Sequence, residues 1–593
     1  MNDSHDTPPT HRWSLSSLAV HITLTGLALG IGLPPAWADG PVRGNPLDSI
    51  PSLPTPGHTG QQPTPALQPG GDAAAQRQQA IQARLGQTIV PRHFNVAGNT
   101  VVPLSQIVPL LEPLVGRSMT VSQLMGEVAK ITKIYQDQGY LLSFALLQNQ
   151  DFRDGLVQVT IVEGYVDRVD FQGNAGPAQD RLQSLAKPLL GDKPLTRAKL
   201  ERVLNLMRQV PGVRVQPQMD LPKFAGGATP LILHVQRQAV RAEGGLADMG
   251  SGLQPLVGIT TGSLTPLGEQ VRLTGAVPIG SHDVKYISGE ITIPIGHDGL
   301  DMVVDGYHYE SHPQDGELQD VGLKRRVVNE RLGLGLRYPL LLDNTRSLTV
   351  EGGVYASRSL DEYRRDSDNL WLNQRTDLRV LRAGLRYRDA SEKQSRDISL
   401  NIYHGLDSAG ASKRYATNAT PSGQPTDLAF PEKLDFTRYT LDVKQTFALP
   451  AGFGITLSGF GQYSADALPT TEQTSFGAWR YGLGYPQGEL AGDKGYGLSV
   501  ELNRRFTTGW AWVSDIQPYI KIDQARAWYN HANERLVSST PRLSSVALGT
   551  RITDNRHYIV DVNVAKPIGD PATNSDHKGV RFNANYSLLY DGW

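Results

Sequence analysis

Few stretches of this chain combine residue types that could bind a metal ion or a phosphate. His308-Tyr309-Glu310-Ser311-His312 would place two imidazoles and a carboxylate on one face of a strand. The segment falls at an expected loop end, so a solvated loop is the favoured interpretation. Met249-Gly250-Ser251-Gly252 is rich in glycine, but it lacks the Lys-Ser/Thr of a phosphate loop and fits a turn between strands better. Residues 570–576 lack the glycine and ligand spacing of a calcium loop.

Catalytic signatures are missing from the sequence as well. It contains no G-x-S-x-G, no H-E-x-x-H and no Walker loop. It contains no cysteine, which excludes disulfides, zinc–thiolate sites and thiol catalysis. Its 57 basic and 58 acidic side chains nearly cancel, so no basic excess is present to bind nucleic acid. We therefore expect a protein that is not an enzyme, carries no cofactor or metal, and has no nucleic-acid partner.

The dominant pattern, from residue 239 to residue 593, is alternation of apolar and polar side chains. The clearest case is Ile516-Gln517-Pro518-Tyr519-Ile520-Lys521-Ile522-Asp523. Successive side chains of a β-strand point to opposite faces, so this pattern predicts strands with one apolar face and one polar face. A water-filled membrane barrel needs this arrangement, with the apolar face toward lipid. A soluble β-sandwich alternates too, with its apolar face turned inward.

The N-terminal residues favour the membrane barrel. His11 and Arg12 precede an apolar stretch from Leu15 to Leu33, and an A-x-A cleavage site ends at Ala38. This order predicts a cleavable signal peptide over residues 1–38, and therefore an exported protein. No later segment approaches the roughly 18 to 20 apolar residues that a membrane helix needs. If the protein enters a membrane, it does so as an antiparallel β-barrel over residues 239–593.

Residues 39–91 are predicted to form a Pro-rich linker and a short helix, and two β/α units are expected to follow at 92–166 and 167–238. In the first unit, a helix from Val121 to Gln138 should end at Gly139, and strands should follow over 141–147 and 156–162. In the second unit, Thr196 should cap the helix and a closing strand should span 231–235. The repeated plan indicates two similar domains.

Short segments spread over most of the mature chain resemble one family, the two-partner secretion transporters of the bacterial outer membrane. These are the TpsB proteins of the ShlB/FhaC/HecB haemolysin secretion/activation type, in the superfamily that includes BamA. The number and order of the segments carry the resemblance, which rests on Phe94-Asn95-Val96-Ala97-Gly98-Asn99-Thr100, Gly139-Tyr140, Val162-Glu163-Gly164, Lys193-Pro194-Leu195-Thr196, Leu200-Glu201-Arg202, Pro211-Gly212-Val213, Arg337-Tyr338-Pro339-Leu340 and Gly461-Gln462-Tyr463-Ser464.

The resemblance implies a transmembrane antiparallel β-barrel of about 16 strands, preceded by two periplasmic α+β POTRA domains. It implies a translocator in the outer membrane of a Gram-negative bacterium. Its POTRA domains would recognise an unfolded exported partner, a TpsA exoprotein such as an adhesin or haemolysin, and the barrel would thread it to the cell surface. Outer-membrane lipid would surround the barrel, and the barrel-assembly machinery would insert it, with the C-terminal aromatic Trp593 as a recognition signal.

The family's in-folded loop carries Val-Arg-Gly-Tyr/Phe, and its arginine meets an aspartate of the barrel wall. Here the aligned motif is Gly482-Leu483-Gly484-Tyr485, so Leu483 stands where the arginine is expected. The aspartate is matched by Asp523, which by parity should face the lumen.

A buried carboxylate without a cation is costly, so we hypothesise that Arg480 reaches Asp523 instead. The alternative is that Asp523 is solvated, or is paired with Lys521 or Arg526.

Client contact is placed, from the resemblance, along the groove between the helix and the edge strand of each POTRA domain. The candidate residues are Leu124, Tyr135, Tyr140, Leu200, Leu204 and Met207. For most of them the domain core is the favoured interpretation, and only aromatic residues that prove exposed would keep the binding role. Two other functions stay open: a barrel-assembly insertase of the BamA type, and a small-solute porin or receptor.

Overall fold

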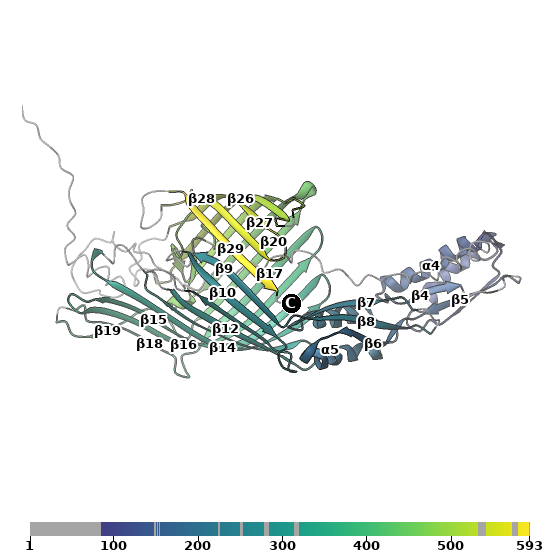
Figure 1. Cartoon of the computed structure of the whole chain (residues 1–593), viewed down its shortest axis with the longest axis horizontal. Helices are drawn as coiled ribbons and strands as arrows, with labels where there is room; N and C mark the ends of the chain where they lie inside the picture. Colours follow the sequence, from purple (N-terminus) through teal and green to yellow (C-terminus); the bar gives the residue numbers. More distant parts are fainter. Residues whose placement is uncertain are drawn as a thin grey trace, which may run out of the picture.

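The computed structural model describes residues 85–591, except 148–149, 151, 153, 223–225, 249–252, 278–283, 314–319, 421, 479, 511, 532–540 and 572–578. The predicted signal peptide at 1–38, nearly all of the predicted linker and helix, and Trp593 lie outside the described residues. The remainder forms two α+β domains in a row that lead to one end of a large barrel (Figure 1).

The first domain contains a three-stranded sheet covered by two helices. In the sheet order β2-β5-β4, β2 runs parallel to β5 and β4 runs antiparallel to it. Thr120 caps the long helix, and its side chain and that of Gln123 form a reciprocal capping box. The elements are β1 (Thr88–Ile89), β2 (His93–Ala97), α3 (Leu104–Leu111), β3 (Met119–Thr120), α4 (Val121–Asp137), β4 (Phe144–Leu147) and β5 (Leu156–Val162).

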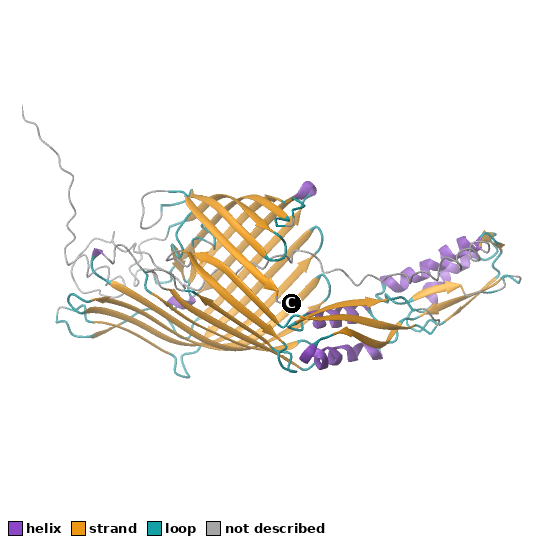
Figure 2. Ribbon diagram, viewed as in Figure 1, coloured by secondary structure: helices purple, strands orange, loops and turns teal. Residues whose placement is uncertain are grey.

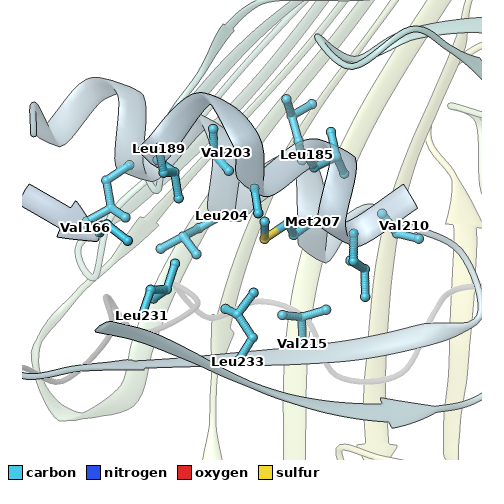
Figure 3. Packing of buried hydrophobic residues seen from close by; sticks show 14 of the residues in the cluster. Val166, Leu185, Leu189, Val203, Leu204, Met207, Val210, Val215, Leu231 and Leu233 are labelled. Carbon is cyan, nitrogen blue, oxygen red and sulfur yellow. The ribbon is translucent and has the colours of Figure 1, made fainter. Parts of the chain in front are cut away.

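The second domain repeats this topology with the sheet order β6-β8-β7. Thr196 caps its long helix, as predicted, by accepting a hydrogen bond from the backbone N–H of Lys199. Its elements are β6 (Tyr165–Gly173), α5 (Gln179–Ala186), α6 (Arg197–Arg208), β7 (Val213–Met219) and β8 (Ala228–Arg237). The core lies between the helices and the sheet, where Leu204 and Met207 face Leu231 and Leu233 (Figure 3).

Both joints of the second domain are made by direct contacts. Toward the first domain, Leu142 is buried in the second domain's core, and the backbone N–H of Arg197 donates to the carbonyl of Gly139 at 2.6 Å. Toward the barrel, Arg202 donates to the Asp298 carboxylate at 3.0 Å and to the Pro339 carbonyl at 3.0 Å. These contacts fix the second domain at the barrel mouth.

The barrel is a closed antiparallel sheet in which each strand pairs with its neighbours and the last strand pairs with the first. Three strands are interrupted, so β17 continues as β18, β19 as β20, and β24 as β25. Counted in this way over the described residues, sixteen strands close the barrel. The strands are β9 (Val240–Asp248), β10 (Leu253–Gly262), β11 (Gln270–Ala276), β12 (Val284–Ile295), β13 (Leu300–Ser311), β14 (Lys324–Leu342), β15 (Arg346–Arg365), β16 (Leu370–Ala390), β17 (Gln394–Gly405), β18 (Ser412–Thr417), β19 (Thr426–Leu428), β20 (Thr437–Ala448), β21 (Phe453–Ser464), β24 (Lys494–Arg504), β25 (Phe506–Thr507), β26 (Asp515–Trp528), β27 (Leu543–Thr553), β28 (Tyr558–Pro567) and β29 (Arg581–Asp591).

The two faces of the barrel wall differ as the alternation predicts. Three leucines of β14 lie on the outer face, and about half or more of the surface of each is exposed: Leu332, Leu334 and Leu336. Arg331 of the same strand points inward and donates to the Asp305 carboxylate at 2.8 Å. An apolar exterior and a polar, ion-paired interior are the arrangement that lipid outside and water inside require. Strands dominate the chain beyond the helical domains (Figure 2). Within the described residues, we find no helix with the length and apolarity needed to cross a bilayer.

Two features of the N-terminal domains were not predicted from the sequence. The first helix of each domain, α3 and α5, was missed, and α3 contains Pro109. Strand β1 pairs with β3, so the first domain begins before residue 92.

Glu163, at the end of β5, joins three parts of the first domain. Its carboxylate accepts hydrogen bonds from the backbone N–H groups of Thr100 at 2.7 Å and Val101 at 3.1 Å, from the Thr100 hydroxyl, and from the Tyr135 hydroxyl at 2.9 Å. Burial would raise the pKa of Glu163, but the hydrogen bonds from Thr100 and Val101 outweigh it and hold that pKa below its usual range. Burial and this same carboxylate raise the pKa of Tyr135.

We expect Glu163→Gln to lower the free energy of unfolding of the first domain by about 1–3 kcal/mol at neutral pH, because charge-assisted hydrogen bonds are lost. The folded-state pKa of Glu163 lies below its unfolded value, so its contribution is present at neutral pH and lost as pH falls through the folded pKa. The difference between wild type and variant should therefore shrink in acid. Urea unfolding of the full chain, followed with a dye on one cysteine introduced into this domain, measures it.

Glu127→Gln is the control, because Glu127 only pairs with Lys130 on the exposed face of α4. It should change the free energy of unfolding by no more than about 0.5 kcal/mol. Equal effects of the two substitutions would contradict the role given to Glu163.

Candidate functional site: a loop folded into the barrel

The connection between β21 and β24 folds back into the barrel. It contains a short hairpin, β22 (Thr474–Phe476) and β23 (Leu490–Gly492), in which Thr474 pairs with Gly492. Phe476 is almost completely buried, against Phe460 of β21 and Ala525 and Ala527 of β26. Because the wall strands are already paired to each other, the hairpin packs on the barrel's inner face through side chains.

The tip of this loop is held by hydrogen bonds from its own backbone. Asp523 of β26 accepts from the N–H of Gly482 at 2.8 Å with Oδ1, and from the N–H of Leu483 at 3.2 Å with Oδ2. Ser545 Oγ of β27 accepts from the N–H of Gly484 at 3.0 Å. Asn583 Nδ2 of β29 donates to the carbonyl of Leu483 at 3.1 Å. We call these four bonds the backbone clamp.

The two glycines of the motif are required by this close approach. Gly482 has φ of +93°, a left-handed conformation that other L-residues rarely adopt. A Cβ on Gly484 would lie 2.6 Å from the backbone nitrogen of Pro567 and 2.9 Å from the carbonyl carbon of Lys566. A side chain at either position would therefore strain the tip or push it off the wall.

The side chains of the motif fill space that the clamp leaves. Leu483 is buried against Ala547 and Ala565, which are small residues on the inner face of β27 and β28. Tyr485 is fully buried, and its hydroxyl donates to the carbonyl of Asp570 at 2.8 Å. The motif is thus held by apolar packing of Leu483 and by the hydrogen bond of Tyr485, without a charged side chain at position 483.

The base of the loop is held by two buried carboxylates. Glu472 accepts from the Tyr355 hydroxyl at 2.9 Å, and its other oxygen lies 2.7 Å from a guanidinium nitrogen of Arg438. Asp493 accepts from the backbone N–H groups of Leu468 at 2.9 Å and Asn530 at 2.7 Å. Glu472 thus fixes the start of the loop to β15 and β20, and Asp493 ties the end of the loop to its start and to the residues just after β26.

Asp523 faces the lumen, as its parity with Tyr519 predicts, and is 2% exposed. The structure records backbone N–H groups as its hydrogen-bond donors, while the guanidinium carbon of Arg480 lies 3.9 Å from the Phe460 ring centroid. The ion pair between Arg480 and Asp523 stays a prediction. Arg526 lies on the outer face with Ile522 and stacks over Trp528 at 5.2 Å, so it is not the partner of Asp523.

The apolar residues proposed for client contact are mostly buried in domain cores. Leu124, Tyr135 and Met207 have no exposed surface, and Leu200 and Leu204 are exposed by only 4% and 2%. Tyr140 is partly buried and packs edge-on against Tyr135, with the ring centroids 6.1 Å apart. Only aromatic residues with exposed surface were expected to contact the client, and of this set only Tyr140 meets that requirement. Client binding by Tyr140 stays a prediction.

Sequence reasoning missed Ser545, Asn583 and Glu472 as residues that hold the loop. The apolar–polar alternation of β27 and β29 places Ser545 and Asn583 on the inner face of the barrel. It does not show which residues of that face contact the loop. Of the histidine-rich segment, His308 Nδ1 lies 3.1 Å from a carboxylate oxygen of Glu330 on the neighbouring strand. Among the described residues, no group of three His, Asp or Glu side chains gathers as a metal site.

Two family profiles match the chain. The POTRA domain of ShlB type matches residues 89–164, which is the first α+β domain. The haemolysin secretion/activation protein ShlB/FhaC/HecB matches residues 261–552, which covers most of the barrel and the whole in-folded loop.

Individual relatives are distant but extend over most of the chain. The heme/hemopexin transporter protein HuxB of Haemophilus influenzae is 20% identical over 497 residues, covering 81% of this chain and 83% of HuxB. The outer membrane transporter CdiB of Dickeya dadantii is 22% identical over 480 residues, covering 76% of this chain and 77% of CdiB. The solved structure of CdiB from Escherichia coli superposes with a TM-score of 0.64 at 17% identity, covering 89% and 94% of the two chains. This last likeness shows a shared fold.

The backbone clamp can be tested by cross-linking, because the chain has no native cysteine. A disulfide between Leu483→Cys and Ala547→Cys should form while the tip is docked, since these residues pack together. Adding Asp523→Ala should lower the cross-linking yield several-fold, because each lost hydrogen bond to a charged group costs about 1.5–3 kcal/mol. Yields are read from gel shifts of protein in isolated membranes.

The control is Asp397→Ala, which removes an inward carboxylate that pairs with Arg386 and Arg388 near the barrel's other end. Its cross-linking yield should stay at the wild-type level. An undiminished yield for Asp523→Ala would show that the clamp does not hold the tip. The hypothesis of an ion pair between Arg480 and Asp523 makes a different prediction. The double variant Arg480→Asp with Asp523→Arg should secrete the partner better than either single variant.

Proposed function

Since the chain belongs to the haemolysin secretion/activation family ShlB/FhaC/HecB, we propose that it secretes an unfolded partner protein of the TpsA type. The partner would be recognised by two periplasmic POTRA domains and threaded through the barrel to the cell surface. The observation that carries this proposal is a closed barrel with a polar bore, entered from an end where a repeated α+β module is anchored.

The entry to the bore supports a path for a polypeptide. A cavity of about 350 Å³ lies between the second domain and the inner wall of the barrel. It is lined by Leu206, Gln209 and Val210 from the domain and by Arg337, Glu351 and Arg386 from the barrel strands. A chain leaving the domain surface would enter the bore among groups that can hydrogen-bond its backbone.

The sheets of the two N-terminal domains offer a way to hold an extended client. Each is a three-stranded sheet with β5 or β8 in the centre, so its outer strands pair on one side only within the described residues. An unpaired strand edge can add a client strand by β-augmentation, with backbone hydrogen bonds that do not depend on client sequence. Repeated weak capture of this kind suits an unfolded chain.

Directionality needs no nucleotide in this scheme. An extended chain inside the bore has few intramolecular contacts, whereas burial of apolar surface at the cell surface stabilises each newly folded segment. Refolding outside therefore disfavours return through the bore. The family is one of transporters, which agrees with the absence of catalytic signatures in the sequence.

The proposed location is the outer membrane, with both α+β domains on the periplasmic side. The apolar outer face of the strands supports contact with lipid. Insertion would use the barrel-assembly machinery. The family match favours partner secretion over the barrel-assembly alternative, because the matching profile is that of secretion/activation proteins.

Deletion of the gene should leave one large exported protein trapped in the periplasm, while other outer-membrane proteins keep their wild-type levels. Complementation with a chain lacking residues 92–238 should restore a pore but not secretion, because the capture surfaces are missing. Secretion is measured by immunoblotting of culture medium and periplasm, and the pore by planar-bilayer conductance.

A full-length chain complements the deletion as the positive control. A general loss of outer-membrane proteins in the deletion strain would instead support the barrel-assembly function. Wild-type distribution of every exported protein, together with altered uptake of small solutes, would support the porin.

A further inference from the structure

Four side chains form a cluster on the outer face of β24 and β26, beside the point where the in-folded loop rejoins the wall. Lys494 pairs across the strands with Trp528, and Tyr496 pairs with Arg526, so the two cations are diagonal neighbours. The guanidinium carbon of Arg526 lies 5.2 Å from the Trp528 ring centroid. The rings of Tyr496 and Trp528 are 5.9 Å apart and inclined at 45°. We call these residues the β24–β26 cluster.

The cluster stands at the edge of the apolar belt. The next outward residues on β24 are Leu498, Val500 and Leu502, all exposed. On β26 the partly exposed Gln524 comes first and is followed by the exposed Ile522 and Ile520. The helical domains contact the opposite end of the barrel, at the turns that hold Asp298 and Pro339. The cluster therefore lies at the level of lipid headgroups on the side away from those domains.

The two cations of the cluster differ from three other outward cations, each of which is accompanied by a carboxylate. Elsewhere on this end of the barrel, Lys285 contacts Glu310 at 3.3 Å, Arg358 contacts Asp377 at 3.0 Å, and Arg414 contacts Asp427 at 3.1 Å. Over the part of the chain that the structure describes, neither Lys494 nor Arg526 has a carboxylate within 4.0 Å. Two uncompensated cations beside two aromatic rings complement an anionic group attached to an apolar chain.

We propose that the β24–β26 cluster binds the phosphate groups of a lipid in the outer leaflet. This proposal rests on the outer-membrane location in the proposed function. Lys494 and Arg526 would donate to phosphate oxygens, Tyr496 and Trp528 would line the headgroup level, and the acyl chains would lie along Leu498 and Ile522.

Such a lipid would sit opposite an anchor of the in-folded loop. The N–H of Asp493 donates to the Trp528 carbonyl at 3.0 Å, and Asp493 also receives the N–H groups of Leu468 and Asn530. The lipid would therefore hold from outside the two strands whose inner side fixes the root and tip of the loop.

The test is lipid binding by the purified full-length protein in detergent, measured by native mass spectrometry. The probes are lipid A with two phosphates, the same lipid after removal of both phosphates, and inorganic phosphate. We expect Lys494→Gln with Arg526→Gln to weaken binding of phosphorylated lipid A roughly 25-fold, since each cation near a charged headgroup contributes about fivefold. Dephosphorylated lipid should bind wild type and variant alike.

Arg414→Gln is the matched control, because Arg414 is exposed at the same end but paired with Asp427. It should bind phosphorylated lipid A as tightly as wild type. Wild-type affinity in the double variant, or an equal loss for dephosphorylated lipid, would overturn the proposal. Tight binding of inorganic phosphate that the double variant loses, with lipid affinity unchanged, would overturn it too.

The lipid result can be separated from the proposed function. If the partner is secreted but the affinity for phosphorylated lipid A does not change when both cations are replaced, only the proposed lipid site is wrong. If phosphorylated lipid binds through the cations but no partner is secreted, the secretion function is wrong and the site stands.

Discussion

Closure of the sheet is the constraint on which the rest of the structure depends. In hydrocarbon, an unpaired backbone N–H or C=O group has no water to bond, so a spanning sheet must have no free edge. Here the ladder between β29 and β9, in which Tyr586 pairs with Leu246, removes the last edge. The enclosed bore gives the loop a wall on every side, and the strand ends at one mouth give the second domain its docking turns.

Alternation in the sequence predicted strands with one apolar and one polar face, because a period of two shows which face each residue takes. The predicted signal peptide then favoured a membrane barrel over a sandwich. Asp523 was placed in the lumen by parity alone, and the structure agrees. The capped helix at Thr196 was also predicted, since cap chemistry is local. Helix α3 was missed because Pro109 interrupts a short segment whose helical state depends on packing of Ile107 and Leu111 in the domain core.

The contacts of the loop could not be predicted in the same way, because they join residues far apart in the chain. Gly484 and Ser545 meet only after the barrel strands from β24 to β27 have been placed in register, and the bond between them uses a backbone group of Gly484. Leu483 showed that the motif departs from that of the family. No neighbouring residue in the sequence indicated that backbone N–H groups would donate hydrogen bonds to Asp523. Tertiary geometry, rather than residue type, determines this part of the site.

The backbone clamp also changes what evolution can alter. The main-chain hydrogen bonds of the clamp do not depend on the type of side chain at position 483, provided that glycine remains on both sides, an acceptor remains opposite, and the side chain fits against Ala547 and Ala565. A leucine at position 483 is therefore compatible with a docked loop. Relatives with the same architecture would escape any search that uses the arginine as its signature, and glycine spacing would find them better.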